Sequence, residues 1–334
     1  MEVSSKSNLS EATKSITGKK PVRRRRLIKR DSSHLKPDIH RQRHLYIKTT
    51  QALTLTNVMG GVGKTTMTIL IAQALTQLYK NTEVLLVDMD PEKHLTAILA
   101  PKVSPETPSL YDMLFGTNTP EGSISKTWIP NVDIIPGAFS LQDMEKKSFK
   151  KNTAAVQKVR QKLNALKQIK YYRFIMYDTP SAATILTTLA LSTSNYYIPI
   201  VNLDRNLIKS LQATEILAAY VSGNSNTDLK RLGILINKYS LKGRNHTAQF
   251  MNHLEEDWPD GTLITPPIPK TIGIEKSSKN YGTILMVPEQ YNFRAVRSTV
   301  LSVAREIGER VMEYSKGRGG DIVNEAFLYK EYWG

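Results

Sequence analysis

The sequence predicts an α/β fold: a doubly wound, mostly parallel sheet of about seven strands flanked by helices. Three observations predict it. Short apolar runs alternate with longer segments of helical periodicity, a glycine-rich loop joins the first run to the first helix, and aspartates end two of the runs. Parallel strands need crossover connections, which helices supply. The expected strands are the apolar runs at 52–58, 84–88, 132–136, 174–178, 196–201, 233–237 and near residue 264.

Helical periodicity fills the segments between these runs. In the first of them Met67, Leu70, Ile71 and Ala74 follow the i, i+3, i+4, i+7 spacing of one helix face. The expected helices span 65–79, 146–166, 208–220, 247–258 and 293–314. This order predicts one domain over residues 49–314, between a basic, flexible N-terminal arm of residues 1–48 and a C-terminal tail of residues 315–334.

Positive charge is concentrated near the N-terminus. The chain holds 46 Lys+Arg and 30 Asp+Glu, a net charge of +16, and residues 1–50 hold 14 and 4 of these, which is +10. Basic segments of this kind bind polyanions through phosphate contacts and counterion release. The arm is therefore expected to contact DNA, the alternatives being a solvated tail or an anionic membrane. The densest part of the arm is the run Arg23, Arg24, Arg25 and Arg26.

Composition excludes several classes of site. The chain has no cysteine, which excludes disulfides, thiolate zinc sites, iron–sulfur clusters and cysteine nucleophiles. Any metal must then be held by oxygen or imidazole ligands. No run of 18 apolar residues and no apolar signal segment is present, so we expect no transmembrane helix and a cytoplasmic location.

The sharpest motif is GGVGKTT at residues 60–66, directly between the first expected strand and the first expected helix. Glycines let backbone N–H groups close around phosphate oxygens, and the helix N-terminus adds its dipole. Lys64 would reach the β- and γ-phosphates, and the Thr65 hydroxyl would ligate Mg²⁺. The expected phosphate site comprises Gly60, Gly61, Val62, Gly63, Lys64, Thr65 and Thr66.

This loop, followed by VLLVDMDP at 84–91 and YRFIMYDTPS at 172–181, resembles the ParA/MinD family of deviant Walker A ATPases. The likeness continues through YIPI at 197–200 and IPK at 268–270, and covers residues 51 to about 312. It implies a P-loop NTPase fold, ATP and Mg²⁺ as cofactors, and hydrolysis of ATP to ADP and phosphate that is slow and stimulated by a partner.

The resemblance also assigns roles to the strand-end aspartates. Asp178 matches the Walker B carboxylate that holds Mg²⁺, and Asp88 would support the same magnesium site. Asp90 matches the carboxylate that positions or activates the attacking water, so Asp90 and Lys64 are the expected catalytic residues. The alternative for Asp90 is an Asp-Pro turn residue. Asn237 and Pro269 are similar to family positions that border adenine.

One position departs from the family. The ATP-dependent dimer of the family uses a lysine just before the two glycines, and this chain has Met59 there, whose thioether carries no charge. ATPases that position carboxysomes in cyanobacteria also lack that lysine. Either the ATP-bound dimer is weak or another lysine reaches across, and the alternative for the candidates is a solvated face. The candidate lysines are Lys147, Lys150 and Lys151.

A second basic surface is expected where the family binds DNA without sequence preference. Binding of this type needs phosphate contacts and no base readout. The candidate residues follow one strand, occupy a late loop and open the last helix: Lys238, Lys242, Arg244, Lys270, Lys276, Lys279, Arg294 and Arg297.

These observations predict a ParA-type ATPase that binds ATP with Mg²⁺, forms a homodimer and binds DNA non-specifically at the nucleoid. An adaptor of ParB type would stimulate hydrolysis and so drive segregation or positioning of a plasmid, a chromosome or a protein microcompartment. The alternative is a MinD-like membrane-associated switch, although the C-terminal segment 326–333 is short and mixed in charge for an anchor. A nucleotide-binding protein with impaired hydrolysis is a third hypothesis.

Overall fold

A computed structural model describes residues 43–104, 106–169, 171–240, 254, 262–271, 273–274, 283–286 and 293–316. Within these residues the central element is a nine-stranded sheet in the order β3-β4-β2-β5-β1-β6-β8-β9, with β7 paired to β6. Every pairing is parallel except that of β3 with β4. The strands are β1 (Gln51–Thr56), β2 (Glu83–Asp88), β3 (Ser125–Lys126), β4 (Val132–Ile135), β5 (Tyr172–Asp178), β6 (Tyr196–Asn202), β7 (Lys230–Arg231), β8 (Ile234–Asn237) and β9 (Leu263–Ile264).

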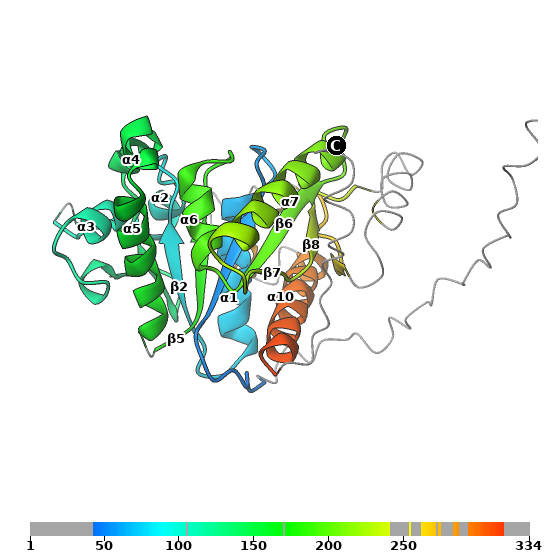
Figure 1. Cartoon of the computed structure of the whole chain (residues 1–334). Coiled ribbons are helices and arrows are strands. Elements are labelled where there is room, and N and C mark those ends of the chain that lie inside the picture. The colour runs from blue at the N-terminus through cyan, green and yellow to red at the C-terminus, as the bar shows by residue number, and fades with distance from the viewer. Residues whose placement is uncertain are drawn as a thin grey trace, which may run out of the picture. The chain divides into compact units, whose positions relative to one another are not determined.

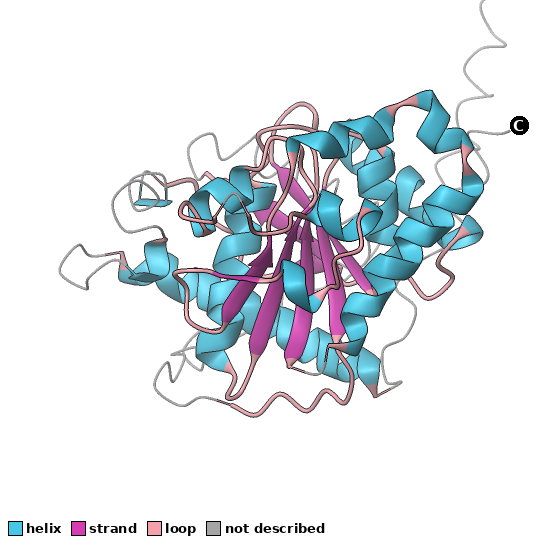
Figure 2. Ribbon diagram, turned by 90° about the vertical axis from the view of Figure 1, so that its left-hand side faces the viewer, coloured by secondary structure: helices cyan, strands magenta, loops and turns pink. Residues whose placement is uncertain are grey.

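The predicted doubly wound fold is confirmed, and each of the seven predicted strands is present. Helices cover both faces of the sheet (Figures 1 and 2). One face carries α1 (Lys64–Leu78), α2 (His94–Leu99) and α10 (Arg294–Ser315). The other carries α3 (Leu110–Phe115), α5 (Thr153–Ala165), α6 (Ile185–Thr193) and α7 (Leu207–Asn224). The remaining short helices are α4 (Lys147–Lys151), η2 (Glu121–Ser123), η3 (Phe139–Glu145), η4 (Leu166–Gln168) and η5 (Ile284–Met286).

The central strands are buried on both faces because helices cover both. Alternate side chains of β5 therefore enter different apolar layers. Phe174 and Met176 pack with α1 and α10, whereas Ile175 and Tyr177 pack with α5 and α6. By the same alternation, Asp178 points to the α1 face of the sheet.

One predicted helix differs from the structure, and three short helices were missed. The expected helix at 146–166 is divided into α4 and α5, because the Asn152 side chain accepts a hydrogen bond from the Ala155 amide at 3.0 Å and caps the second helix. The short helices α2, α3 and α6 were not predicted. The expected helix at 247–258 lies almost wholly outside the described residues, as do residues 1–42 and 317–334. None of the described helices has both the length and the apolar character needed to cross a membrane.

The described chain begins within the segment that the sequence assigned to the arm. The Arg43 amide donates to the carbonyl of Leu78 at 2.8 Å, and the Lys80 amide donates to the carbonyl of Arg43 at 2.9 Å. Ile47 is buried against the α1 face of the sheet. Residues 43–48 are therefore attached to the end of α1 that is opposite the glycine-rich loop.

Candidate nucleotide-binding site

The glycine-rich loop connects β1 to α1 at the carboxyl edge of the sheet. Gly61 and Gly63 have φ angles of +74° and +95°, which favour glycine because other residues are strained there. Gly63 is the N-cap of α1, and no side chain caps this helix. The first-turn amides of α1 are therefore available to an anion, as helix N-termini are in phosphate sites.

Asn57 fixes the start of the loop. Its side-chain oxygen accepts from the Met59 amide at 2.7 Å, and its amide nitrogen donates to the carbonyl of Ile200 at 2.7 Å. Met59, at the position where the resemblance led us to expect a lysine, is half-buried and packs against the apolar layer on the α1 face. The Met59 side chain is thus part of the packing and supplies no charge to the loop.

Two residues at the end of β8 hold the middle of the loop. The Asn237 side chain donates to the carbonyl of Val62 at 2.7 Å, and Lys238 Nζ donates to the carbonyl of Gly61 at 2.6 Å. Asn237 packs so closely that a Cβ on Gly63 would lie 2.4 Å from its amide nitrogen. Glycine at position 63 is therefore required by both backbone conformation and space.

Lys64 is buried at the start of α1, and its ammonium group has two partners. Nζ donates to the carbonyl of Met59 at 3.1 Å and to the hydroxyl of Ser181 at 2.8 Å. Burial lowers the pKa of Lys64 from its usual value, although the carboxyls of Asp178 and Asp90 oppose this shift. Those two carboxyls therefore lie within electrostatic range of the Lys64 ammonium group.

Asp178 and Asp88 end the neighbouring strands β5 and β2 and are partners in register. Asp178 is fully buried, and neither of its carboxyl oxygens accepts a hydrogen bond of good geometry, although the Thr65 hydroxyl lies close enough to interact with them. Burial, with the nearby charges of Asp88 and Asp90, raises the pKa of Asp178 to about 8, while the Thr65 hydroxyl and the Lys64 ammonium group oppose the shift. A buried carboxyl without a well-formed hydrogen bond is costly unless a cation binds it, so this position fits a magnesium ligand.

Asp88 differs from Asp178 because its oxygens are already engaged. They accept hydrogen bonds from the Thr96 amide at 2.8 Å, the Thr96 hydroxyl at 2.6 Å and the Asp90 amide at 3.2 Å. Burial nevertheless raises the pKa of Asp88 to about 6. Gly137 lies against this carboxyl, since a Cβ there would be 2.9 Å from Asp88 Cγ, and its amide donates to the Thr96 hydroxyl at 2.9 Å.

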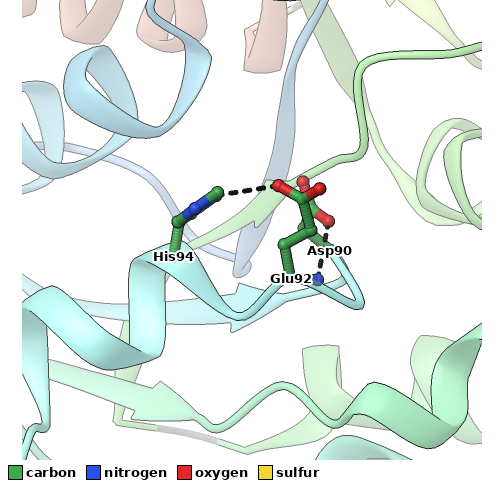
Figure 3. Close-up of side chains that lie close together, drawn as sticks. All are labelled: Asp90, Glu92 and His94. Carbon is green, nitrogen blue, oxygen red and sulfur yellow. Dashed lines mark hydrogen bonds and ion pairs between the residues drawn. The ribbon is translucent and has the colours of Figure 1, made fainter.

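Asp90 lies in the turn between β2 and α2, where its side chain accepts from the Glu92 amide at 3.0 Å. The turn interpretation of Asp90 therefore has a structural basis, and the half-buried carboxyl still acts electrostatically on Lys64 and Asp178. Figure 3 shows Asp90 beside Glu92 and His94, whose ligand atoms lie within 4.8 Å of one another. Glu92 Oε2 is 3.3 Å from His94 Nδ1.

The other candidate residues are more dispersed. Pro269 is half-buried and forms a backbone bridge to Tyr239, two residues after Asn237. Lys147, Lys150 and Lys151 lie in α4, and Lys150 forms an ion pair of 2.7 Å with Glu145. Among the candidate DNA-binding residues, Lys270 is exposed after β9, and Arg294 and Arg297 lie in the first turn of α10. Lys238 contacts the glycine-rich loop, as described above. The remaining candidates lie outside the described residues: Arg23, Arg24, Arg25, Arg26, Lys242, Arg244, Lys276 and Lys279.

Sequence reasoning did not identify several residues that shape this site. Thr96 donates to Asp88, and Gly137 packs against the Asp88 carboxyl and donates to Thr96. Ser181 accepts from Lys64, and Lys238 donates to the loop as well as standing among basic residues. Ser181 falls inside the Walker B motif, so its place after Asp178 was a signal. No local signal marks Thr96, because its partner is eight residues away across a turn.

The parallel sheet, the glycine-rich loop that leads into α1 and the aspartate at the end of β5 define a P-loop NTPase. Residues 50–230 match a family model described as AAA domain, which is more than half of the chain. The chain belongs to this family, and its relatives place it among the ParA/MinD-type P-loop ATPases.

Two relatives and two solved structures illustrate the similarity. The sporulation initiation inhibitor protein Soj of Bacillus subtilis is 26% identical over 256 residues, covering 76% of this chain and 97% of Soj. The chromosome partitioning protein ParA of Caulobacter vibrioides is 25% identical over 261 residues, covering 78% of this chain and 94% of that ParA. An ATP complex of Cyanothece McdA has a TM-score of 0.67 at 18% identity, covering 78% and 97%. Cobyrinic acid a,c-diamide synthase of Mycobacterium smegmatis, with an ATP analogue and magnesium, has a TM-score of 0.63 at 22% identity, covering 80% and 97%.

Proposed function

We propose that this P-loop ATPase binds ATP with Mg²⁺, dimerises, binds DNA without sequence preference, and drives segregation or positioning of a cargo through adaptor-stimulated hydrolysis. One observation carries the nucleotide part of the proposal. The fully buried carboxyl of Asp178 accepts no well-formed hydrogen bond, and it lies near the Thr65 hydroxyl and the Lys64 ammonium group at the uncapped N-terminus of α1. Ionising this buried carboxyl is costly without a cation, and the free amides at the helix terminus favour an anion. A nucleotide–magnesium complex supplies both partners.

The residues of the site then have distinct tasks. Asp178 and Thr65 would hold Mg²⁺, with Asp88 fixed behind them, and the bound ion neutralises charge on the phosphate oxygens. Lys64 would turn from Ser181 toward the β- and γ-phosphates. Asp90 would orient a water for attack on the γ-phosphorus, where the new P–O bond forms as the bond to the ADP oxygen breaks, releasing ADP, phosphate and a proton.

The choice of ATP and of a partition-type process is supported by similar proteins. Cyanothece McdA has been solved as an ATP complex, and the ParA of C. vibrioides is named a chromosome partitioning protein. By this similarity we propose that the cargo is a plasmid, a chromosome or a microcompartment. Its adaptor would be a protein of ParB type.

The DNA part of the proposal is supported by charge. Lys270 and Arg294 are exposed on the domain, and the run of four arginines at 23–26 adds a second basic segment. Non-specific DNA binding uses lysine and arginine contacts to phosphates, so affinity should fall steeply with salt. This site would keep the protein on the nucleoid while ATP is bound.

ATP turnover and ATP binding, measured on the full chain, test the nucleotide part. Lys64→Ala should lose both binding and hydrolysis. Asp90→Ala should bind ATP within about twofold of the wild type and lose at least about 100-fold in turnover, because it removes positioning of the water and no phosphate contact. Glu92→Ala, an exposed carboxylate in the same turn, is the matched control. Normal turnover in Asp90→Ala would refute the assignment.

Gel-shift titrations on unrelated DNA duplexes, with ATP, ADP and no nucleotide, test the DNA part. We expect the strongest DNA binding with ATP. Equal binding in all three states would contradict the proposal that ATP controls DNA binding through the dimer. Deleting residues 1–42 leaves the Arg43 contacts in place and should lower both the affinity and its salt dependence. In a separate assay, co-sedimentation of the protein with anionic lipid vesicles would instead support a MinD-like membrane-associated switch.

A further inference from the structure

Lys238 occupies an unusual position beside the phosphate loop. It directly follows β8, has a φ of +52°, and its ammonium group donates to the carbonyl of Gly61 at 2.6 Å. The left-handed backbone region is uncommon for a lysine. The contact joins residues that are 177 positions apart in the chain, so it is a property of the folded domain.

The peptide units of the loop give this contact a consequence. The C=O and N–H groups of a trans peptide unit point in opposite directions. Lys238 holds the carbonyl of Gly61 toward β8, so the amide of Val62 points away from β8. Asn237 holds the carbonyl of Val62 in the same way, so the amide of Gly63 also points away. Two successive amides held on one side of the backbone form an anion-binding nest.

Charge adds to this geometry. The side chain of Met59 carries no charge. Within the described residues, two ammonium groups donate to carbonyls of the loop: Lys64 to the carbonyl of Met59, and Lys238 to the carbonyl of Gly61. Lys64 is buried, whereas Lys238 lies at the exposed rim. Hydrogen bonds from charged donors are stronger than those between neutral groups, so Lys238 can fix the loop and also raise its local positive potential.

We propose that Lys238 is a positioning residue of the phosphate site, which orients the Val62 amide and adds, from the same subunit, positive charge for the polyphosphate part of the nucleotide. This inference rests on the proposed function, because it assumes that the loop binds a nucleoside triphosphate. It is separate from the assignment of Lys238 to a DNA-binding surface, which requires the ammonium group to point to solvent.

Titration calorimetry with two probes, ATP and inorganic tripolyphosphate, each with Mg²⁺, tests the proposal on the full chain. Lys238→Met should weaken binding of both probes by the same factor, about tenfold, which equals about 1.4 kcal/mol. Lys80→Met is the matched control, an exposed lysine at the far end of α1, and should bind both probes as the wild type does. Tripolyphosphate carries no base or ribose, so an equal loss for both probes assigns the effect to the phosphates.

Conservative variants separate positioning from folding. Lys238→Arg keeps a charged donor and should stay within about threefold of the wild type, while Lys238→Gln keeps a neutral donor and should bind less tightly than Lys238→Arg. If Lys238→Met fails to fold, the comparison of Arg with Gln carries the test. The proposal is overturned if Lys238→Met binds tripolyphosphate as tightly as the wild type does. Where Lys238→Met does not fold, the same result in Lys238→Gln overturns it. A loss of affinity for ATP alone also overturns it. Failure of the wild type to bind ATP overturns the proposed function itself.

Discussion

The ammonium group of Lys64 donates a hydrogen bond to the Ser181 hydroxyl at 2.8 Å, which joins the N-terminus of α1 to the loop after β5. In the proposed function the same ammonium group contacts nucleotide phosphates. Ser181 therefore competes with the nucleotide for Lys64, and it connects occupation of the phosphate loop to the segment that leads into α6.

Ser181→Ala should therefore tighten ATP binding by about tenfold, because the unliganded state loses a hydrogen bond to a charged donor worth about 1.5 kcal/mol. The melting temperature of the nucleotide-free protein should fall by a few degrees. Calorimetric titration and thermal unfolding measure the two effects. Ser315→Ala, whose hydroxyl bonds only within α10, is the control. Weaker ATP binding in Ser181→Ala would show that the hydroxyl contacts the nucleotide instead.

The buried carboxyl of Asp178 should make the stability of the metal-free protein depend on pH. Its pKa is about 8 in the folded protein and 3.8 in the unfolded chain. The folded state therefore holds the proton more tightly, and the free energy of unfolding falls as pH rises through this window, by up to about 1.4 kcal/mol for each pH unit. Below about pH 4 both states are protonated and the penalty is absent.

Asp178→Asn removes this titration. The melting temperature of the variant, relative to that of the wild type at the same pH, should therefore rise between pH 5 and pH 8. A gain of several degrees is expected, and thermal unfolding in a chelating buffer measures it. Asp228→Asn, which changes an exposed carboxylate, controls for surface charge. Identical pH profiles for wild type and Asp178→Asn would contradict the burial argument.

Much of the site could be predicted from the sequence because its main parts are local. The glycine-rich loop follows a strand directly, and Asp88 and Asp178 are the last residues of two apolar runs. Parallel strands put their carboxyl ends at one edge of the sheet, so these side chains had to meet the loop there. The strand order was not needed for that conclusion.

The missing parts are contacts between distant segments and short helices. Ser181 lies 117 residues from Lys64, and periodicity carries no information about such a pairing. Lys238 was grouped with surface lysines because composition cannot show which backbone carbonyl an ammonium group contacts. Helices of six residues such as α2 have too few turns for an apolar period, although Asn152 was a readable N-cap within the expected helix at 146–166.

Gly137→Ala should disturb the proposed magnesium site without touching the glycine-rich loop. The added Cβ would lie 2.9 Å from Asp88 Cγ and 3.1 Å from the backbone carbonyl of Asp88, and a backbone atom cannot move aside cheaply. We expect a loss of about 1–3 kcal/mol in unfolding free energy and at least about tenfold in ATP turnover. Chemical denaturation and steady-state assays measure the two.

Gly223→Ala in α7 is the matched control, since its added Cβ meets no atom within 4 Å and alanine favours a helix. It should be neutral or stabilise the protein by up to about 1 kcal/mol. Equal effects of the two substitutions would show that contact with Asp88 is not the cause.

The lysines of α4 should divide into one structural residue and two that are free to meet a second subunit. Lys150 pairs with Glu145 Oε2 at 2.7 Å, and the other oxygen of Glu145 accepts from the Ile185 amide at the start of α6 at 3.0 Å. Lys147 and Lys151 form no ion pair with the described residues. If α4 supplies the cation that Met59 does not, the unpaired lysines are better placed to do so, because no bond must be broken.

In an Asp90→Ala background, where ATP persists, Lys147→Met combined with Lys151→Met should weaken ATP-dependent dimerisation by at least about tenfold in sedimentation velocity. Lys150→Met should instead lower the melting temperature by a few degrees and leave dimerisation within about threefold, since its charge is already used by Glu145. Lys80→Met combined with Lys158→Met controls for lost positive charge. If the double variant dimerises as well as Asp90→Ala alone, α4 does not contribute to the subunit interface. Lys238 would then be the second cation beside the glycine-rich loop.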